Sequence, residues 1–402
     1  MAIAINQNPL THTPATNPVL FVFTRDQTAQ PNFSYKVELF INSALFGTYE
    51  LYPMFGTYCK FDASEYVRSF VSTHLEYLSG FSWVSVDQAV DMYIVVHESY
   101  GTPPALEDSA TSAGNYVFNG SLRYNDFIAF NDNNYWLDYT NGTSPTFMSS
   151  YPIDQRQITP YGAPFFVGIL VNRDHEYYEL KLNIFDITGT MTYSYINVID
   201  LDFIVNMLDI SPRSMDSNGW TTGSEWDTCY YYEVQLIATY DSIPYTTQYT
   251  LPIRLYLDQS CYRFEQQRLY WVNKFGIVEQ FDFNMYSEES TSINSYGYQV
   301  QPGDWIEGFY NLSLMDTEKK INMKTAEDRI TLNTDWIKPA VQNWLVRELY
   351  ESPQAWIWNK STGFQPVIIE NKDSRQKTRF KDGLIQETVV ATITWSYRSQ
   401  LN

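Results

Sequence analysis

The feature that most constrains this chain's fold is a repeated alternation of apolar and polar residues with a period of two. Residues 33–41 read FSYKVELFI, and residues 176–187 and 249–257 alternate in the same way. This period is typical of strands with one face on a core and one face in water. Short strands without long helices between them favour antiparallel sandwiches over a βαβ layout. Residues 165–171 and 176–187 are predicted to form a hairpin, and 230–240 is predicted to pair with 249–257.

Aromatic residues supply 17% of the sequence, with 33 Tyr, 24 Phe and 11 Trp. Tyrosine and tryptophan join a large apolar ring to one polar tip, which suits half-buried strand positions and protein interfaces. This composition favours sheets whose outer faces meet other proteins.

Two segments break the strand pattern and are predicted as helices. The first covers 62–78, where Asp62 and Glu65 have the spacing of a capping box. The second begins near Pro339 and ends before residues 352–353, Ser-Pro. Its predicted buried stripe consists of Val341, Trp344, Leu345 and Leu349. Strands are expected to follow at 355–359, 366–370 and 384–397.

The domain organisation follows from these patterns and from the charge. We expect an N-terminal arm at 1–16, a β-sandwich with one helix at 17–105, a second β-sandwich region at 106–300 and a mixed α+β domain at 301–402. A Gly/Pro/Ser-rich stretch at 100–115 is predicted to be a linker. Residues 301–402 hold 13 basic and 13 acidic residues, whereas 1–300 hold 13 basic and 33 acidic. The last boundary rests on this shift in charge.

The formal net charge of −20 opposes binding to nucleic acid and to anionic membranes. No signal peptide and no apolar run of about 18 residues is found, so synthesis and folding in a reducing cytoplasm are expected. The cysteines Cys59, Cys229 and Cys261 lack metal-ligand spacing and are predicted to be buried reduced thiols.

Motifs for catalysis are not found: the sequence has no nucleophile elbow, zinc-protease, P-loop or dinucleotide signature. Its histidines, His12, His74, His97 and His175, have no partner at metal-ligand spacing. We therefore predict a protein that is not an enzyme and that needs no cofactor or metal.

Two acidic regions leave alternatives open. Asp126, Asp132, Asp138, Glu176 and Glu225 lie among aromatic residues, so a carboxylate pair of the glycosidase kind is conceivable. A solvated acidic face is the favoured interpretation. The run at 131–134, Asn-Asp-Asn-Asn, would offer oxygen ligands to calcium, but an Asx-rich turn is the simpler reading.

A basic segment near the C-terminus is the one candidate site, and it consists of Lys372, Arg375, Lys377, Arg379 and Lys381. Such a run is commonly a solvated face. In a strongly acidic protein it can also dock on the acidic surface of a neighbouring copy, and contact with nucleic acid is a weaker alternative. We predict it as a subunit interface.

Two stretches resemble tail proteins of crAss-like phages of Bacteroidetes. In residues 261–283 the shared pattern is a Cys, a strand of the form L-x-W-x-N, a Gly-containing turn and a strand of the form F-x-F. Here these are Cys261, Leu269, Trp271, Asn273, Gly276, Phe281 and Phe283. Residues 330–357 resemble the L-N-T-x-W-I, helix, W-L-x-x-x-L and S-P segment of the same proteins. The turn at 274–277 departs from the more glycine-rich turn of related segments.

The resemblance implies a structural virion protein of the tail or neck, made in the host cytoplasm. It implies a fibronectin-III-like or immunoglobulin-like N-terminal sandwich, a homo-oligomeric ring around the DNA channel, and contacts with other tail or portal-adjacent proteins. The alternative function is a receptor- or carbohydrate-binding protein at the tail tip, with Trp220 or Trp226 stacking on sugars.

Overall fold

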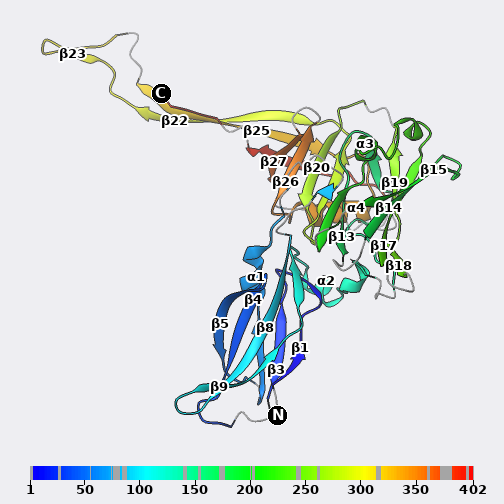
Figure 1. Ribbon diagram of the computed structural model, residues 1–402. Helices are drawn as coiled ribbons and strands as arrows, with labels where there is room; N and C mark the ends of the chain where they lie inside the picture. Colours follow the sequence, from blue (N-terminus) through cyan, green and yellow to red (C-terminus); the bar gives the residue numbers. More distant parts are fainter. Residues whose placement is uncertain are drawn as a thin grey trace. The chain divides into compact units, whose positions relative to one another are not determined.

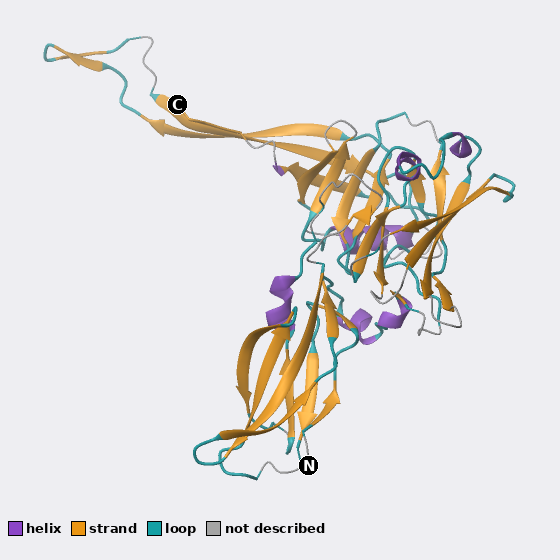
Figure 2. Cartoon of the chain, viewed as in Figure 1, coloured by secondary structure: helices purple, strands orange, loops and turns teal. Residues whose placement is uncertain are grey.

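The computed structural model describes most of the chain and divides it into two compact units (Figure 1). The described residues are 3–25, 29–54, 56–73, 75, 82–83, 88–138, 143–152, 155–171, 177–199, 201, 204–240, 246–259, 263–313, 318–359, 363–371, 383–394 and 398–401. Unit 1 consists of residues 1–259 and 272–279, and unit 2 of residues 260–271 and 280–402. Strands dominate both units, which confirms the predicted mainly-β fold (Figure 2). The fibronectin-like arrangement and the four-part division stay predictions.

The first part of unit 1 is a sandwich of two sheets. The smaller sheet has the order β1-β3-β6, with β1 (Ala4–Gln7), β3 (Leu20–Thr24) and β6 (Tyr58–Asp62). The larger has the order β2-β10-β8-β4-β5, with β2 (His12–Pro14), β10 (Asn115–Phe118), β8 (Ala89–Tyr100), β4 (Ser34–Ile41) and β5 (Ala44–Leu51), and β9 (Ala105–Thr111) also pairs with β8. The alternating residues of both sheets meet in one core, which includes Phe21, Phe23, Tyr35 and Ile94.

Local predictions for this sandwich need three corrections. The predicted arm contains β1, which pairs with β3, and β2, which runs parallel to β10. The predicted linker at 100–115 is instead largely strand, because β9 pairs back on β8. The predicted helix is found only as α1 (Ser64–Val67) and a 3-10 turn (Arg68–Phe70), since Val71 returns to extended backbone, and residues 74 and 76–78 of the prediction lie outside the described residues. Its N-cap is Ala63, and Asp62 accepts a hydrogen bond from the Ser64 amide instead of forming a capping box.

The second sandwich of unit 1 also has two sheets. One has the order β11-β13-β16-β7, with β11 (Trp136–Leu137), β13 (Phe166–Val171), β16 (Val205–Asp209) and β7 (Ser82–Trp83). The other has the order β12-β19-β17-β14-β15, with β12 (Ile158–Pro160), β19 (Ile253–Asp258), β17 (Tyr231–Tyr240), β14 (Tyr177–Phe185) and β15 (Met191–Ile199), and β18 (Thr246–Tyr249) also pairs with β17.

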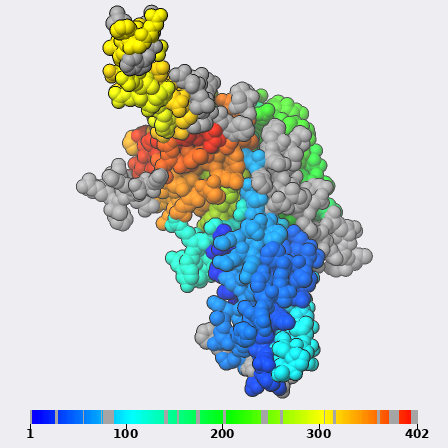
Figure 3. All heavy atoms as spheres, turned by 90° about the vertical axis from the view of Figure 1, so that its left-hand side faces the viewer, coloured from blue at the N-terminus to red at the C-terminus, as the bar shows by residue number. Residues whose placement is uncertain are grey.

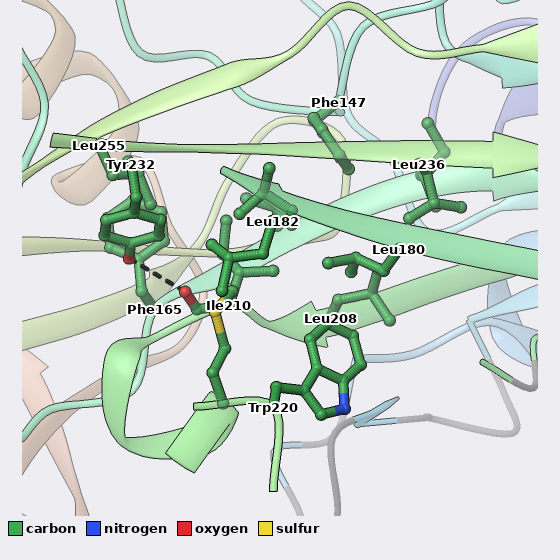
Figure 4. Close-up of a cluster of buried hydrophobic side chains, with 14 of the residues drawn as sticks. Phe147, Phe165, Leu180, Leu182, Leu208, Ile210, Trp220, Tyr232, Leu236 and Leu255 are labelled. Atoms are coloured by element: carbon green, nitrogen blue, oxygen red, sulfur yellow. Dashed lines mark hydrogen bonds between the residues drawn. The ribbon is translucent and has the colours of Figure 1, made fainter. Parts of the chain in front are cut away.

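The core of this sandwich is filled from both sheets and from a loop that covers it (Figure 4). Leu180 and Leu182 of β14 meet Leu208 of β16, and Trp220 packs against them from the loop. Tyr232 is fully buried, and its hydroxyl donates to the carbonyl of Ile210 at 3.0 Å. The buried hydroxyl of Tyr232 is therefore satisfied by backbone, which limits the cost of burying this tyrosine.

The strand pairing of the second sandwich confirms one prediction and contradicts another. Strands β17 and β19 pair antiparallel, as the sequence predicts. The predicted hairpin of 165–171 with 176–187 is wrong, because β13 pairs with β11 and β16 whereas β14 pairs with β15 and β17. Every residue of β13 is buried, so both of its faces are covered. A run of this kind does not identify its partner strand.

Short helices connect the strands of unit 1. They are α2 (Tyr124–Ile128), α3 (Pro212–Ser217) and the 3-10 turns Asp132–Asn134 and Ser224–Trp226. The Asn131 side chain accepts from the amide of Asn133, which confirms the Asx-turn interpretation of this run.

Unit 2 is built on one large sheet with the order β21-β20-β26-β27-β28-β25-β22. Its strands are β20 (Gln267–Val272), β21 (Val278–Phe283), β22 (Glu288–Gln299), β25 (Lys319–Asn333), β26 (Ala355–Asn359), β27 (Gly363–Ile369) and β28 (Thr388–Ile393), and β29 (Arg398–Leu401) also pairs with β25. A separate hairpin joins β23 (Asp304–Ile306) to β24 (Phe309–Asn311).

Helix α4 (Pro339–Leu349) forms as predicted, with the predicted stripe buried, and it covers part of this sheet. Pro339 occupies the first turn, where its missing amide hydrogen costs nothing. Trp344 packs against Trp271 of β20 and Phe281 of β21, with ring centroids 5.2 and 6.0 Å apart. No helix in the described part of the chain combines the length and apolarity that spanning a bilayer requires.

The predicted hairpin at 269–283 is confirmed as β20 and β21. Its turn runs from Asn273 to Gly276, and the Gly276 amide donates to the Asn273 carbonyl at 2.9 Å. The Asn273 side chain accepts from the amides of Phe275 and Ile277. Leu269 and Trp271 are both fully buried, but so is Tyr270 between them. This hairpin is therefore covered on both faces, and its tip belongs to unit 1.

Candidate assembly surface

Strands β22 and β25 form a two-stranded ribbon that changes from buried to exposed along its length. At its base, Ile330 and Leu332 are 2% and 0% exposed and belong to the core of unit 2. Further along, β25 pairs with β29 through Met323–Ala326, and beyond that β22 is the only strand paired with it in the described chain. The 12 residues of β22 correspond to roughly 40 Å of strand. Figure 1 shows the ribbon continuing past the other strands of unit 2.

Apolar side chains lie on both faces of the exposed half. Directly opposite residues share a face of a ribbon. Tyr296 pairs with Met323 and Tyr298 with Lys320, so both tyrosines lie on one face, where they are 55% and 49% exposed. The other face carries Ile293, Ser295, Ile321 and Lys324. Ile293 is 63% exposed. Neither face of the ribbon is therefore a conventional polar surface.

The tip adds a second apolar cluster. Ile306 pairs with Phe309 across a two-residue turn made by Glu307 and Gly308, and both turn residues have positive φ. Two positive φ angles are required by the type I′ turn that closes tight hairpins. This turn leaves Ile306 57% and Phe309 74% exposed, with Leu312 nearby in sequence at 68%. In the space-filling view the yellow residues of the ribbon project beyond the orange and red strands of the same unit (Figure 3).

The outer part of the ribbon differs in charge from the rest of the chain. The paired segments 294–299 and 319–324 read NSYGYQ and KKINMK, with three lysines and no acidic residue. Lys319, Lys320 and Lys324 are all exposed. The first 300 residues of the chain, in contrast, hold 33 acidic and 13 basic residues. The outer part of the ribbon is thus a basic, aromatic patch on a strongly acidic protein, whereas β22 and β25 taken whole hold four basic and four acidic residues.

The basic segment predicted as a subunit interface lies outside the described residues. Lys372, Arg375, Lys377, Arg379 and Lys381 all fall within 372–382, which the structure does not describe. Their role in assembly stays a prediction. The ribbon lies in the same unit and offers a second basic element, which the sequence reasoning missed.

The ribbon has only a weak signal in the sequence. Segments 288–299 and 319–333 are rich in polar and β-branched residues without strict alternation. That composition permits a strand but does not mark a buried face. The turn residues Glu307 and Gly308 were the available signal, because a Gly after a polar residue favours a tight hairpin turn.

The carboxylates considered as a catalytic pair are placed in separate structural roles. Asp132 is buried against His12, accepting from the His12 amide at 3.0 Å. Burial by itself would raise the pKa of Asp132, but the hydrogen bonds and charge of His12 outweigh it and lower that pKa. Asp126 is exposed and forms an ion pair with Lys274. Glu225 accepts from Thr222 near a 3-10 turn.

The remaining two carboxylates complete this picture. Asp138 is 2% exposed, and Glu176 lies outside the described residues. Within the described residues, Asp126, Asp132 and Glu225 each interact with a different partner, which gives no sign of a carboxylate pair.

The tryptophans proposed to stack on sugars are buried. Trp220 is 2% and Trp226 3% exposed, and both belong to the core of the second sandwich. The Trp226 indole donates to Asp216 at 2.8 Å. A sugar cannot reach either ring, so this part of the carbohydrate-binding prediction is wrong. Truncating either side chain would test core stability, at about 3–5 kcal/mol, and not ligand binding.

The cysteines and histidines in the described residues have packing roles. Cys59 and Cys229 are buried free thiols, as predicted. Cys261, His74 and His175 lie outside the described residues. His12 stacks on Tyr116 and lies against Trp136, and His97 is 3.4 Å from Glu38. No group of three or more potential metal ligands occurs where the structure is described.

Comparison with known proteins does not assign the chain to a family. No family model matches the chain, and no curated protein matches it. One solved structure, described as "Crystal Structure of Tripeptidyl Peptidase 2 (TPP II)", aligns at 9% identity with a TM-score of 0.17. The alignment covers 100% of this chain and 32% of the peptidase chain. A likeness this weak carries no argument about fold or activity.

Proposed function

We propose that this protein is a structural component of a phage tail or neck, and that it assembles with copies of itself into a ring through the β22–β25 ribbon. The observation that carries the proposal is the exposed apolar surface of the ribbon and its tip. The resemblance of residues 261–283 and 330–357 to tail proteins of crAss-like phages supports the virion setting.

The ribbon's exposure favours a protein partner. A two-stranded ribbon alone is marginally stable in water, because too little apolar surface is buried to offset its ordering entropy. Phe309 at 74% and Ile306 at 57% exposure form an anchor of the kind that interfaces bury at their centre. Burying each of them contributes about 1.5–3 kcal/mol. A partner therefore stabilises the ribbon as well as the assembly.

Charge favours a second copy of this chain as that partner. The ribbon lysines Lys319, Lys320 and Lys324 are complementary to an acidic surface. The first 300 residues of every copy supply an excess of 20 acidic over basic residues. A ribbon that contacts a different patch on the next copy makes a heterologous interface. Such interfaces close into rings when the rotation permits. An acidic lining would let DNA pass through the ring without adhering.

The charge-based part of the proposal is tested by reversing the three ribbon lysines. We expect the triple variant of Lys319→Glu, Lys320→Glu and Lys324→Glu to sediment as a monomer at concentrations where the unaltered chain sediments as an oligomer. Analytical ultracentrifugation at low salt measures this, and rising salt should dissociate the unaltered oligomer, since screening weakens exposed charge pairs.

The matched control reverses three exposed basic residues of unit 1, Lys60, Arg68 and Arg213. It should leave the oligomer intact. Equal sedimentation of the ribbon variant and the unaltered chain would overturn the proposal.

A further inference from the structure

A pocket of about 750 Å³ opens on the outer face of the second sandwich in unit 1. Its walls come from residues 146–152 and 155–157, from Tyr135, and from strands β17 and β19 with the two residues before β19. Tyr135, Phe147, Tyr151, Pro152 and Leu251 provide apolar surface. The volume falls within the range of small-ligand sites, and the mixture of rings and polar groups is typical of them.

Arg156 is held in place at this pocket by aromatic rings. Its guanidinium carbon lies 3.9 Å from the ring centroid of Tyr256 and 5.0 Å from that of Tyr230. The two tyrosines meet edge to face at 5.7 Å. Stacking fixes the plane of a guanidinium but leaves the N–H groups along its edge available to an anion. The side chain is therefore ordered before a ligand arrives.

A second arginine that lines the same pocket, Arg254, has an acidic partner. Arg254 lies over Tyr231 at 4.6 Å, and its Nε and Nη2 donate to Glu233 at 2.9 and 2.6 Å. Arg254 is thus neutralised within the protein. Within the described part of the chain, no carboxylate lies within ion-pair distance of Arg156.

The neighbours of Arg156 add hydrogen-bonding groups. Gln155 and Gln157 flank it in sequence and line the same pocket, together with Thr146. Amide side chains both donate and accept, which matches vicinal hydroxyl groups. Tyrosine rings offer flat apolar surface to the C–H face of a sugar. A fork of N–H donors pairs best with a planar oxyanion such as a carboxylate.

We propose that this pocket binds an acidic saccharide, with the carboxylate of one sugar unit on Arg156 and its hydroxyl groups on the glutamine amides. The volume suits one or two sugar rings rather than an extended peptide. The site is independent of the ribbon, so it holds whether or not the chain assembles as proposed above.

The test is calorimetric titration of the full chain with digalacturonate, with its neutral methyl ester and with a triglutamate peptide as comparison ligands. We expect digalacturonate to bind, and Arg156→Gln to weaken it about tenfold or more, the effect of removing a charged hydrogen-bond partner. Arg156→Lys keeps the charge but loses the planar fork, so it should also bind more weakly than the unaltered chain. Arg213→Gln, an exposed arginine outside the pocket, should have no effect.

Thermal unfolding of each variant shows whether the fold is intact, since Arg156 is exposed and its replacement should leave the midpoint unchanged. No binding of digalacturonate would overturn the site. Equal binding of the neutral ester would show that Arg156 does not bind the carboxylate. Tighter binding of the peptide would show that the ligand is an acidic peptide and not a saccharide. Binding unaffected by either Arg156 variant would place the ligand elsewhere.

Discussion

At the scale of single residues, Gly276 shows how tightly the β20–β21 turn is fitted. Its φ is +75°, and a Cβ at this position would lie 1.6 Å from the carbonyl oxygen of Asn119. Its own carbonyl accepts from the Thr73 hydroxyl at 2.6 Å, and Thr73 in turn accepts from the Asn119 amide at 2.8 Å. The turn is thus locked to two other segments of unit 1 by a backbone approach that only glycine permits.

Replacing this glycine gives the first prediction for stability. Gly276→Ala is expected to lower the unfolding free energy by about 2–4 kcal/mol, because it adds a backbone clash to the strain of a positive φ. Gly219→Ala is the matched control: its φ is +73°, but nothing lies within 4 Å of the added Cβ. It should cost only about 1 kcal/mol. Urea unfolding measures both, and equal losses would contradict the close approach at Gly276.

The buried thiols give a second prediction. Burial raises the pKa of Cys229 to about 12 and also raises the pKa of Cys59. At pH 8 both are therefore neutral thiols, whereas an unhindered cysteine is partly thiolate. In a Cys261→Ser background, we expect no reaction of the native protein with a thiol-specific chromophore at pH 8 and two equivalents after unfolding. Rapid labelling of the native protein would show that one of these thiols is accessible.

At the scale of elements, the sequence predicts what depends on local pattern and misses what depends on partners. Helix α4 and the β17–β19 pair are predicted by the spacing of their apolar residues, and both are present in the structure. The pairing of β13 does not, because a strand buried on both faces has no periodic signal for its neighbour. The predicted helix after Asp62 stops at Phe70: Val71 is extended, and the Thr73 hydroxyl donates to the carbonyl of Gly276, a contact distant in sequence.

The candidate sites also divide into those that the local sequence predicts and those that depend on distant residues. The basic segment at 372–381 is visible in sequence because charge is a local property, although the structure does not describe it. The ribbon and the Arg156 pocket depend on exposure and on segments distant in sequence. Tyr256 is 100 residues from Arg156, and no local rule brings them together. Exposure of Phe309 likewise follows from the ribbon leaving the sheet, which its sequence does not specify.

The tip of the ribbon gives a prediction at this scale. Ile306→Ser with Phe309→Ser should weaken self-association by about 3–6 kcal/mol, the loss of two buried anchors, while leaving the unfolding midpoint of the chain unchanged. Light scattering coupled to size exclusion measures the association. The control is Tyr124→Ser with Ile128→Ser on α2, whose side chains are 78% and 66% exposed. If both double variants weaken association equally, the tip has no special role.

At the scale of the whole molecule, the account predicts a subunit with two different contact surfaces. The acidic majority of the chain supplies one of them, and the outer part of the ribbon, with its three lysines and exposed aromatic residues, supplies the other. Heterologous contacts of this kind produce closed rings or open filaments, and a tail or neck protein around DNA requires closure.

The measurement that tests this most directly is negative-stain electron microscopy of the purified full chain beside its Lys319→Glu, Lys320→Glu, Lys324→Glu variant. The account predicts closed rings of a single subunit number for the unaltered chain and dispersed monomers for the variant. Dispersed monomers of the unaltered chain at every concentration and salt would contradict it, as would rings that persist in the variant.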